Sequence, residues 1–168
     1  MTDTVDETVD FERQQCAYFL AALLSSNALD VSAVCATVRP DDIALLDDPT
    51  ATIYRVAVGL ARRGVTPDHT QVWAKLLQDG EFAGRKGELV RDRMLAVVSV
   101  RAYAERLFET AAQLLSLVFR NRLAAAGAAI AQAAVDFSEA DAWALMIREG
   151  GETRKIYERI ERLRGEAA

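Results

Sequence analysis

Apolar residues recur at three- and four-residue spacing over most of the chain, and no segment alternates with a period of two over strand length. This periodicity is typical of amphipathic helices and predicts an all-α fold. A first helix is expected from about Phe11 to Ser26, and a second from about Leu29 to Val38. The second helix should end there because Arg39 precedes a proline, and helical backbone is disfavoured at that position.

Prolines, glycines and acidic residues mark the next helix boundaries. Asp48-Pro49 predicts a helix start, since a carboxylate caps backbone amides and proline is tolerated in the first turn. Gly64 is expected to end this helix in the left-handed conformation. Pro67-Asp68 opens another helix, with Gln71 completing a capping box, and Gly80 closes it. The paired acids Asp41-Asp42 and Asp47-Asp48 each lie beside a proline at a helix boundary, and we interpret them as caps in preference to a cation site or an acid–base pair.

The second half of the chain predicts longer helices. Residues 81–87 are expected to form a loop and residues 88–98 a short helix. Ser99 is expected to cap a helix that continues to about Val135 without a proline, far beyond the average helix length.

A returning segment follows this long helix. Ser138 and Asp141 predict a second capping box, and the amphipathic pattern then continues to about residue 165. Gly150-Gly151 is expected to break or kink this segment. Two long helices joined by a short turn predict an antiparallel helical hairpin.

The predicted organisation has three parts. Residues 1–10 form an acidic disordered tail, residues 11–98 a small helical head, and residues 99–165 a long hairpin of the same domain. An extended hairpin would leave apolar stripes for a second molecule to cover, whereas a compact bundle, with the long helix folded back, would cover them internally. The residues of the candidate self-association or partner face are Tyr103, Leu107, Leu114, Val118, Ile156, Tyr157 and Ile160.

The net charge of −5 is unevenly distributed along the chain. Residues 1–12 carry five acids and no base, so the other 156 residues balance 20 basic against 20 acidic side chains. A protein that binds the phosphate backbone strongly usually has a basic excess. We therefore expect direct DNA binding to be weak or absent. The weak candidate contacts are Arg154, Lys155 and Arg159, which alternate with glutamates, and a second basic cluster is Arg120-Asn121-Arg122.

No motif for catalysis, a cofactor or a metal is found in the sequence. The phosphate-binding pattern G-x-x-x-x-G-K-[ST] is absent, and the only histidine, His69, is expected at the surface near a helix start. Cys16 and Cys35 lie on apolar faces and are expected to be reduced. No uninterrupted apolar run reaches the length of a membrane span, and the acidic start is unlike a signal peptide. A cytoplasmic, non-enzymatic protein is predicted.

The order of short motifs resembles the amino-terminal domain of DnaB-type replicative helicases. The resemblance runs from about Phe11 to Ala126, more loosely to Leu163, and rests on motif order and spacing together. The matching segments are Leu20-Ala21-Ala22-Leu23-Leu24, Arg39-Pro40-Asp41-Asp42-Ile43, Ile53-Tyr54, Leu60-Ala61-Arg62-Arg63-Gly64, Pro67-Asp68, Val72, Leu76 and Ala102-Tyr103-Ala104.

This resemblance implies a function without an active site. In that family the domain is a helical head and hairpin that pairs into dimers, three of which form a collar, and the collar docks primase or a helicase loader. The prediction is a protein-interaction and oligomerisation module of the replication machinery, a homodimer or trimer of dimers that binds helicase, primase or loader. The alternatives are a fragment or remnant of a full-length helicase, a primase carboxy-terminal region, or a small helical nucleic-acid-binding protein.

Overall fold

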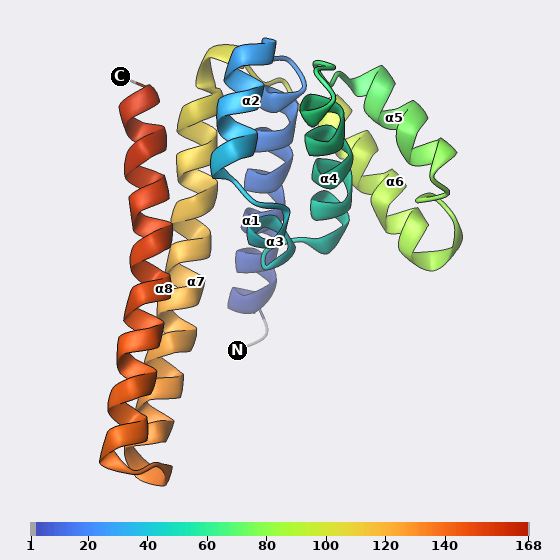
Figure 1. The fold of residues 1–168 in the computed structure, drawn as a ribbon. Coiled ribbons are helices and arrows are strands. Elements are labelled where there is room, and N and C mark those ends of the chain that lie inside the picture. The colour runs from blue at the N-terminus through green and yellow to red at the C-terminus, as the bar shows by residue number, and fades with distance from the viewer. Residues whose placement is uncertain (1–2, 168) are drawn as a thin grey trace.

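The computed structural model describes residues 3–167, and every regular element in that range is helical (Figure 1). The predicted all-α fold is confirmed. The α-helices are α1 (Asp3–Leu23), α2 (Ala28–Thr37), α3 (Pro40–Ala44), α4 (Asp48–Arg62), α5 (His69–Gln78), α6 (Gly84–Ser99), α7 (Leu107–Asp136) and α8 (Glu139–Glu166), with a short 3₁₀ helix at Ala104–Arg106.

The helices form a head with two long helices beside it. In Figure 1, α7 and α8 lie side by side over their whole length and extend well beyond the head, an arrangement compatible with the predicted antiparallel hairpin. In the head, α1 packs against α7 and α6, while α4 packs against α3, α5 and α6. The helices α5 and α6 form the side of the head farthest from α8 (Figure 1).

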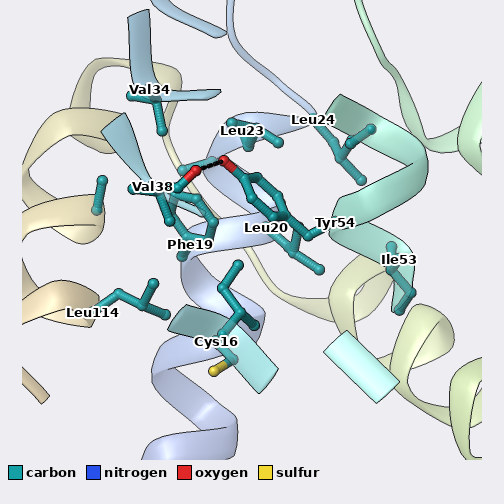
Figure 2. Packing of buried hydrophobic residues seen from close by; sticks show 14 of the residues in the cluster. Cys16, Phe19, Leu20, Leu23, Leu24, Val34, Val38, Ile53, Tyr54 and Leu114 are labelled. Carbon is teal, nitrogen blue, oxygen red and sulfur yellow. Dashed lines mark hydrogen bonds between the residues drawn. The ribbon is translucent and has the colours of Figure 1, made fainter. Parts of the chain in front are cut away.

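The second half of α1 is the centre of the head. Every residue from Cys16 to Leu24 except Tyr18 is buried, so this segment is apolar on all sides and needs partners all round. Phe19 of α1 meets Tyr54 of α4 with ring centroids 5.5 Å apart, a tilted arrangement that aromatic pairs favour. The Tyr54 hydroxyl is fully buried and donates to the Val38 carbonyl at 3.0 Å, which ties α4 to the end of α2 (Figure 2).

Most of the predicted boundary signals are present, with one shift. Asp47, one residue before the predicted cap, is the N-cap of α4 and accepts from the Thr50 amide at 3.1 Å. Asp68 caps α5 by accepting from the Gln71 amide at 2.8 Å. Gly64 and Gly80 follow α4 and α5 with φ of 74° and 73°, in the left-handed conformation that was predicted for Gly64.

Three predicted boundaries are wrong. Residues 3–10 of the expected disordered tail belong to α1, and residues 1–2 of it lie outside the described residues. The predicted loop 81–87 ends early because α6 begins at Gly84. Ser99 ends α6 instead of capping the long helix, which begins at Leu107 and has 30 residues.

Gly150 and Gly151 do not interrupt the hairpin, which corrects the predicted break or kink. The helix α8 is continuous over 28 residues, from Glu139 to Glu166. Both glycines are exposed, and a Cβ added at either would meet nothing within 4 Å. The buried side chains of Glu149 and Thr153, on either side of the glycines, pack α8 in place and offset the low helix propensity of glycine.

The two cysteines are free thiols in the structure. Cys16 is fully buried, and burial, reinforced by the nearby Asp47 carboxylate, raises the pKa of its thiol to about 12. Cys35 is half-buried; burial raises the pKa of its thiol, while a hydrogen bond with Tyr54 opposes the shift. Both thiols are therefore protonated at neutral pH and poor nucleophiles.

One helical segment, Ala104–Asp136, has the length and mean hydropathy of a membrane span. Charged and polar residues interrupt its apolar runs, so the segment does not stand out in the sequence as one continuous apolar stretch. Length and composition alone do not separate a membrane span from the core helix of a soluble protein. Leu107, Leu114 and Leu115 of this segment are fully buried against the head.

We predict that alanine at Gly150 or Gly151 stabilises the protein. Alanine loses less backbone entropy than glycine in a helix and has room at both positions, so each substitution should add about 0.5–1 kcal/mol to the free energy of unfolding. The measurement is urea denaturation followed by circular dichroism.

Gly87→Ala is the matched control. A Cβ at Gly87 would lie 2.1 Å from the backbone carbonyl carbon of Phe82, so the same substitution must displace backbone and destabilise the protein. Equal effects at Gly87, Gly150 and Gly151 would contradict the continuous α8 described above.

Candidate functional site

Most of the predicted self-association face is internal. Leu107, Leu114, Val118, Ile156 and Ile160 are buried within the chain itself, so the prediction that they form a partner face is wrong. Their stripes pack α7 against α8 and the head. An apolar stripe in a sequence does not indicate whether the same chain or another chain covers it.

The two tyrosines of the predicted face differ from the other five residues. Tyr103 and Tyr157 are about half exposed. The ring of Tyr157 packs near Phe119 of α7, with centroids 6.2 Å apart, so one side of it supports the hairpin. Only these two residues of the predicted face are accessible to a partner.

A different apolar surface lies at the free end of the hairpin. Large side chains from the end of α7, the turn and the start of α8 are exposed there, and we call this set the tip surface: Val135, Phe137, Trp143, Met146 and Ile147. Trp143 is 62% exposed and Val135 81%. Phe137, Trp143 and Met146 line a cavity of about 380 Å³, together with Ile130, Ala134 and neighbours.

The tip surface is exposed because the hairpin there has only two layers. The head ends well above it (Figure 1), so each helix can bury one stripe against the other and no more. In the last part of α7, Ala126 and Ala133 are buried, while the residues around them are mostly exposed. Alanine at the contact brings two helices close together but buries little apolar area per residue.

A buried glutamate stabilises the hairpin partway along its length. Glu149 of α8 is 7% exposed and pairs with Arg122 of α7 at 2.5 Å and with Arg148 at 3.3 Å. A buried carboxylate needs such partners, because removing a charge from water is costly. Arg122, part of a basic cluster near the middle of α7, is therefore occupied within the chain.

Arg159 connects α8 to the head. Its guanidinium contacts both carboxylate oxygens of Asp42, at 2.5 and 2.9 Å, and donates to the Thr37 carbonyl at 3.1 Å. Both side chains of the ion pair are about nine-tenths buried. The prediction of Arg159 as a nucleic-acid contact is therefore wrong, since its charge is neutralised inside the protein.

The other two candidate nucleic-acid contacts are exposed and paired. Arg154 pairs with Glu158 at 2.9 Å, and Lys155 pairs with Glu152 at 2.6 Å. The hydrogen bond and charge of Lys155 lower the pKa of the Glu152 carboxyl. This surface of α8 presents alternating charges, as the sequence indicated, and no basic patch.

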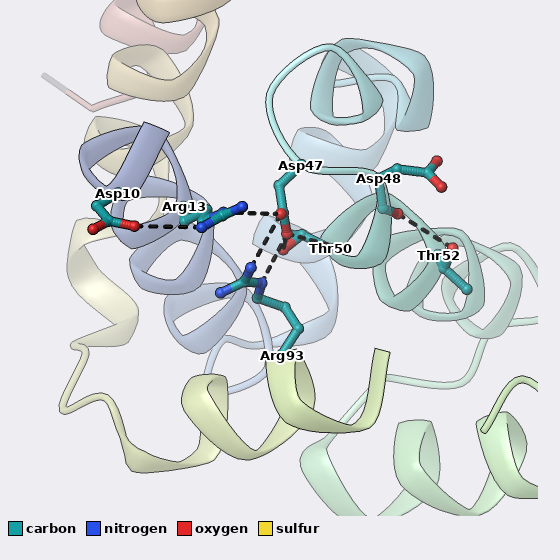
Figure 3. A network of polar contacts seen from close by, with 7 residues as sticks. All are labelled: Asp10, Arg13, Asp47, Asp48, Thr50, Thr52 and Arg93. Carbon is teal, nitrogen blue, oxygen red and sulfur yellow. Dashed lines mark hydrogen bonds and ion pairs between the residues drawn. The ribbon is translucent and has the colours of Figure 1, made fainter. Parts of the chain in front are cut away.

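The acids interpreted as caps have a second role in ion pairs. Asp42 accepts from the Arg39 amide at 2.8 Å in addition to binding Arg159. Asp47 accepts from Thr50 and receives two hydrogen bonds from Arg93 of α6, at 2.8 and 3.1 Å, with Arg13 of α1 at 3.9 Å (Figure 3). Sequence reasoning missed these pairs because the partners are up to 117 residues apart.

No described group of side chains has the composition of a metal site. Among residues 3–167, no three or more His, Cys, Asp or Glu side chains are placed to hold one ion. His69 is half-buried, which corrects the expected surface position, and its Nδ1 atom is buried without a hydrogen-bond partner among the described residues. No described His, Cys, Asp or Glu side chains are placed with His69 to form a metal site.

Comparisons with protein-family models, with curated proteins and with solved structures find no match to this chain. The candidate site therefore rests on the described geometry, and its most distinctive feature is the tip surface.

We predict that Arg159→Met destabilises the protein while Arg154→Met does not. The first variant leaves Asp42 buried without its main partner and should lower the free energy of unfolding by about 3 kcal/mol. The second removes an exposed pair and should change it by less than about 0.5 kcal/mol. Denaturant titration measures both, and equal stabilities would refute the assigned role of Arg159.

Proposed function

We propose that this protein is a non-enzymatic oligomerisation and protein-interaction module of the DNA replication machinery, similar to the collar of DnaB-type helicases. The observation that carries the self-association part is the tip surface. Five large apolar side chains lie together on a helical hairpin, and Trp143 and Phe137 are of the kinds that dominate protein interfaces. Clustered apolar exposure of this kind marks interaction sites.

The replication role is supported by the helix order and by the motif resemblance. A small helical head followed by two long packed helices agrees with what the resemblance implies for a collar. The described ion pairs of Arg154, Lys155 and Arg159 favour this proposal over a nucleic-acid-binding protein, because each of these charges already has an acidic partner. We propose that the helicase, its primase or its loader is the partner.

Disruption of the tip surface should dissociate the oligomer. We expect the native chain to sediment as a dimer or a trimer of dimers, and the double variant Trp143→Glu/Ile147→Glu as a monomer, because two carboxylates cannot be buried there unpaired. Leu89→Glu, at a 54% exposed position on α6, is the control and should leave the oligomer intact.

Sedimentation velocity at several protein concentrations makes this measurement. A native chain that remains monomeric at high concentration rules out self-association. An oligomer that survives the double variant places the interface elsewhere.

The replication role predicts direct binding to a purified replication protein. Immobilised full chain should retain at least one of the replicative helicase, the primase and the helicase loader from the same cell, and the interaction should persist after nuclease treatment because the chain itself makes the contact. Interferometry measures the three affinities, with an unrelated helical protein of similar charge as the control. If none of the three proteins binds, the proposed replication role is wrong. Self-association is tested independently by the sedimentation experiment.

A further inference from the structure

A groove at the opposite end of the hairpin from the tip surface has no assigned role. It lies between α1, α7 and the end of α8 and has a volume of about 810 Å³. The residues that matter for its chemistry are Phe11, Glu109, Gln113, Leu117, Arg120 and Arg164. Phe11 is half exposed, and Leu117 is only partly buried.

Among the helices of the head, only α1 contributes lining residues to the groove. The helix α2 packs against both α7 and α8, but no residue of α2 or α3 lines the groove. The helices α7 and α8 therefore bind the ten-residue helix α2 at one place and leave an open groove at another. The packing of α2 shows that a short helix fits against α7 and α8.

The dimensions of the groove suit a helix of about three turns. Its lining residues on α7 run from Glu109 through Gln113 and Leu117 to Arg120. Eleven steps of helical rise amount to about 17 Å, and the positions lie on one face of α7. An amphipathic helix that docks in such a groove contacts it with residues at i, i+3, i+4 and i+7.

The charged side chains in the groove indicate the charge that a docked helix would carry. Glu109 is held by Arg106 through two hydrogen bonds, at 2.8 and 2.9 Å, and Arg164 pairs with Glu161 at 2.7 Å. Arg120 is exposed and makes no ion pair or hydrogen bond with any side chain that the structure describes. The one charge in the lining that is left without an opposite partner is therefore positive.

We propose that this groove binds an amphipathic helix of another protein, with an apolar face on Phe11 and Leu117 and a carboxylate paired with Arg120. The proposal rests on the proposed function as an interaction module and specifies the chemistry of the partner. The carboxylate and the arginine would form a charge-assisted hydrogen bond at the edge of an apolar contact, which fixes the register of the docked helix.

A displayed library of 15-residue helical peptides is the probe, selected against the purified full chain. The expected binders share apolar residues at i, i+3 or i+4, and i+7, with Asp or Glu at a fixed position beyond them. Synthetic copies are then measured by fluorescence anisotropy. Arg120→Glu should weaken their binding at least about tenfold, because an attraction becomes a repulsion.

Arg91→Glu is the matched control. Arg91 is an exposed arginine of α6 outside the groove, so the same change of charge there should leave binding unchanged. A peptide whose acid is replaced by lysine should bind the Arg120→Glu variant better than the native chain. Gln113→Trp, which fills an exposed lining position, should also abolish binding.

Three results would overturn the proposal. They are the recovery of no binding peptide, binding that is insensitive to Arg120→Glu and Gln113→Trp, and dissociation of the native oligomer by Arg120→Glu. The last result would show that a second copy of the chain occupies the groove. If Trp143→Glu/Ile147→Glu loses the oligomer but still binds the peptides, the tip surface and the groove are separate sites. If the peptides do not bind but the oligomer forms and the replication partner binds, the groove proposal fails and the proposed function stands.

Discussion

The segment from Cys16 to Leu24 is buried on nearly every side, and this burial is the constraint that places the other helices. An apolar helix without a polar face is stable in water only when neighbours cover it all round. The helices α4, α6 and α7 pack directly against α1. The aromatic contact between Phe19 and Tyr54, with the Tyr54 hydrogen bond to Val38, then fixes how α4 meets α1 and the end of α2.

Two acids convert this apolar packing into a defined arrangement of helices. Asp47 caps α4 and binds Arg93 of α6, while Asp42 caps α3 and binds Arg159 of α8. Each carboxylate is buried, and its cap and its guanidinium together satisfy it. The Asp42–Arg159 pair joins α8 to the head and so helps to fix where the tip surface lies relative to the head.

The burial of apolar residues differs between the two ends of the hairpin. Beside the head, most of its apolar stripes are covered by α1 and by the partner helix, while the groove near Arg120 remains open. Beyond the head, two helices alone cannot bury their apolar residues, and Phe137, Trp143 and Ile147 remain exposed. A geometry that stabilises a long projecting hairpin therefore creates an apolar end, and this end is the surface that we propose for self-association.

The sequence by itself determined the all-α class, the helix stops at Gly64 and Gly80, and the capping role of acids at helix starts, because these depend on residues within one or two turns. It misplaced the start of the long helix at Ser99 and the break at Gly150-Gly151, where packing outweighed local propensity. Only the tertiary structure decided that Leu114 and Ile160 are internal, that Arg159 binds Asp42, and that Trp143 is exposed. A periodic apolar stripe shows which residues must be buried. Which segment or molecule buries them depends on contacts between residues far apart in the chain.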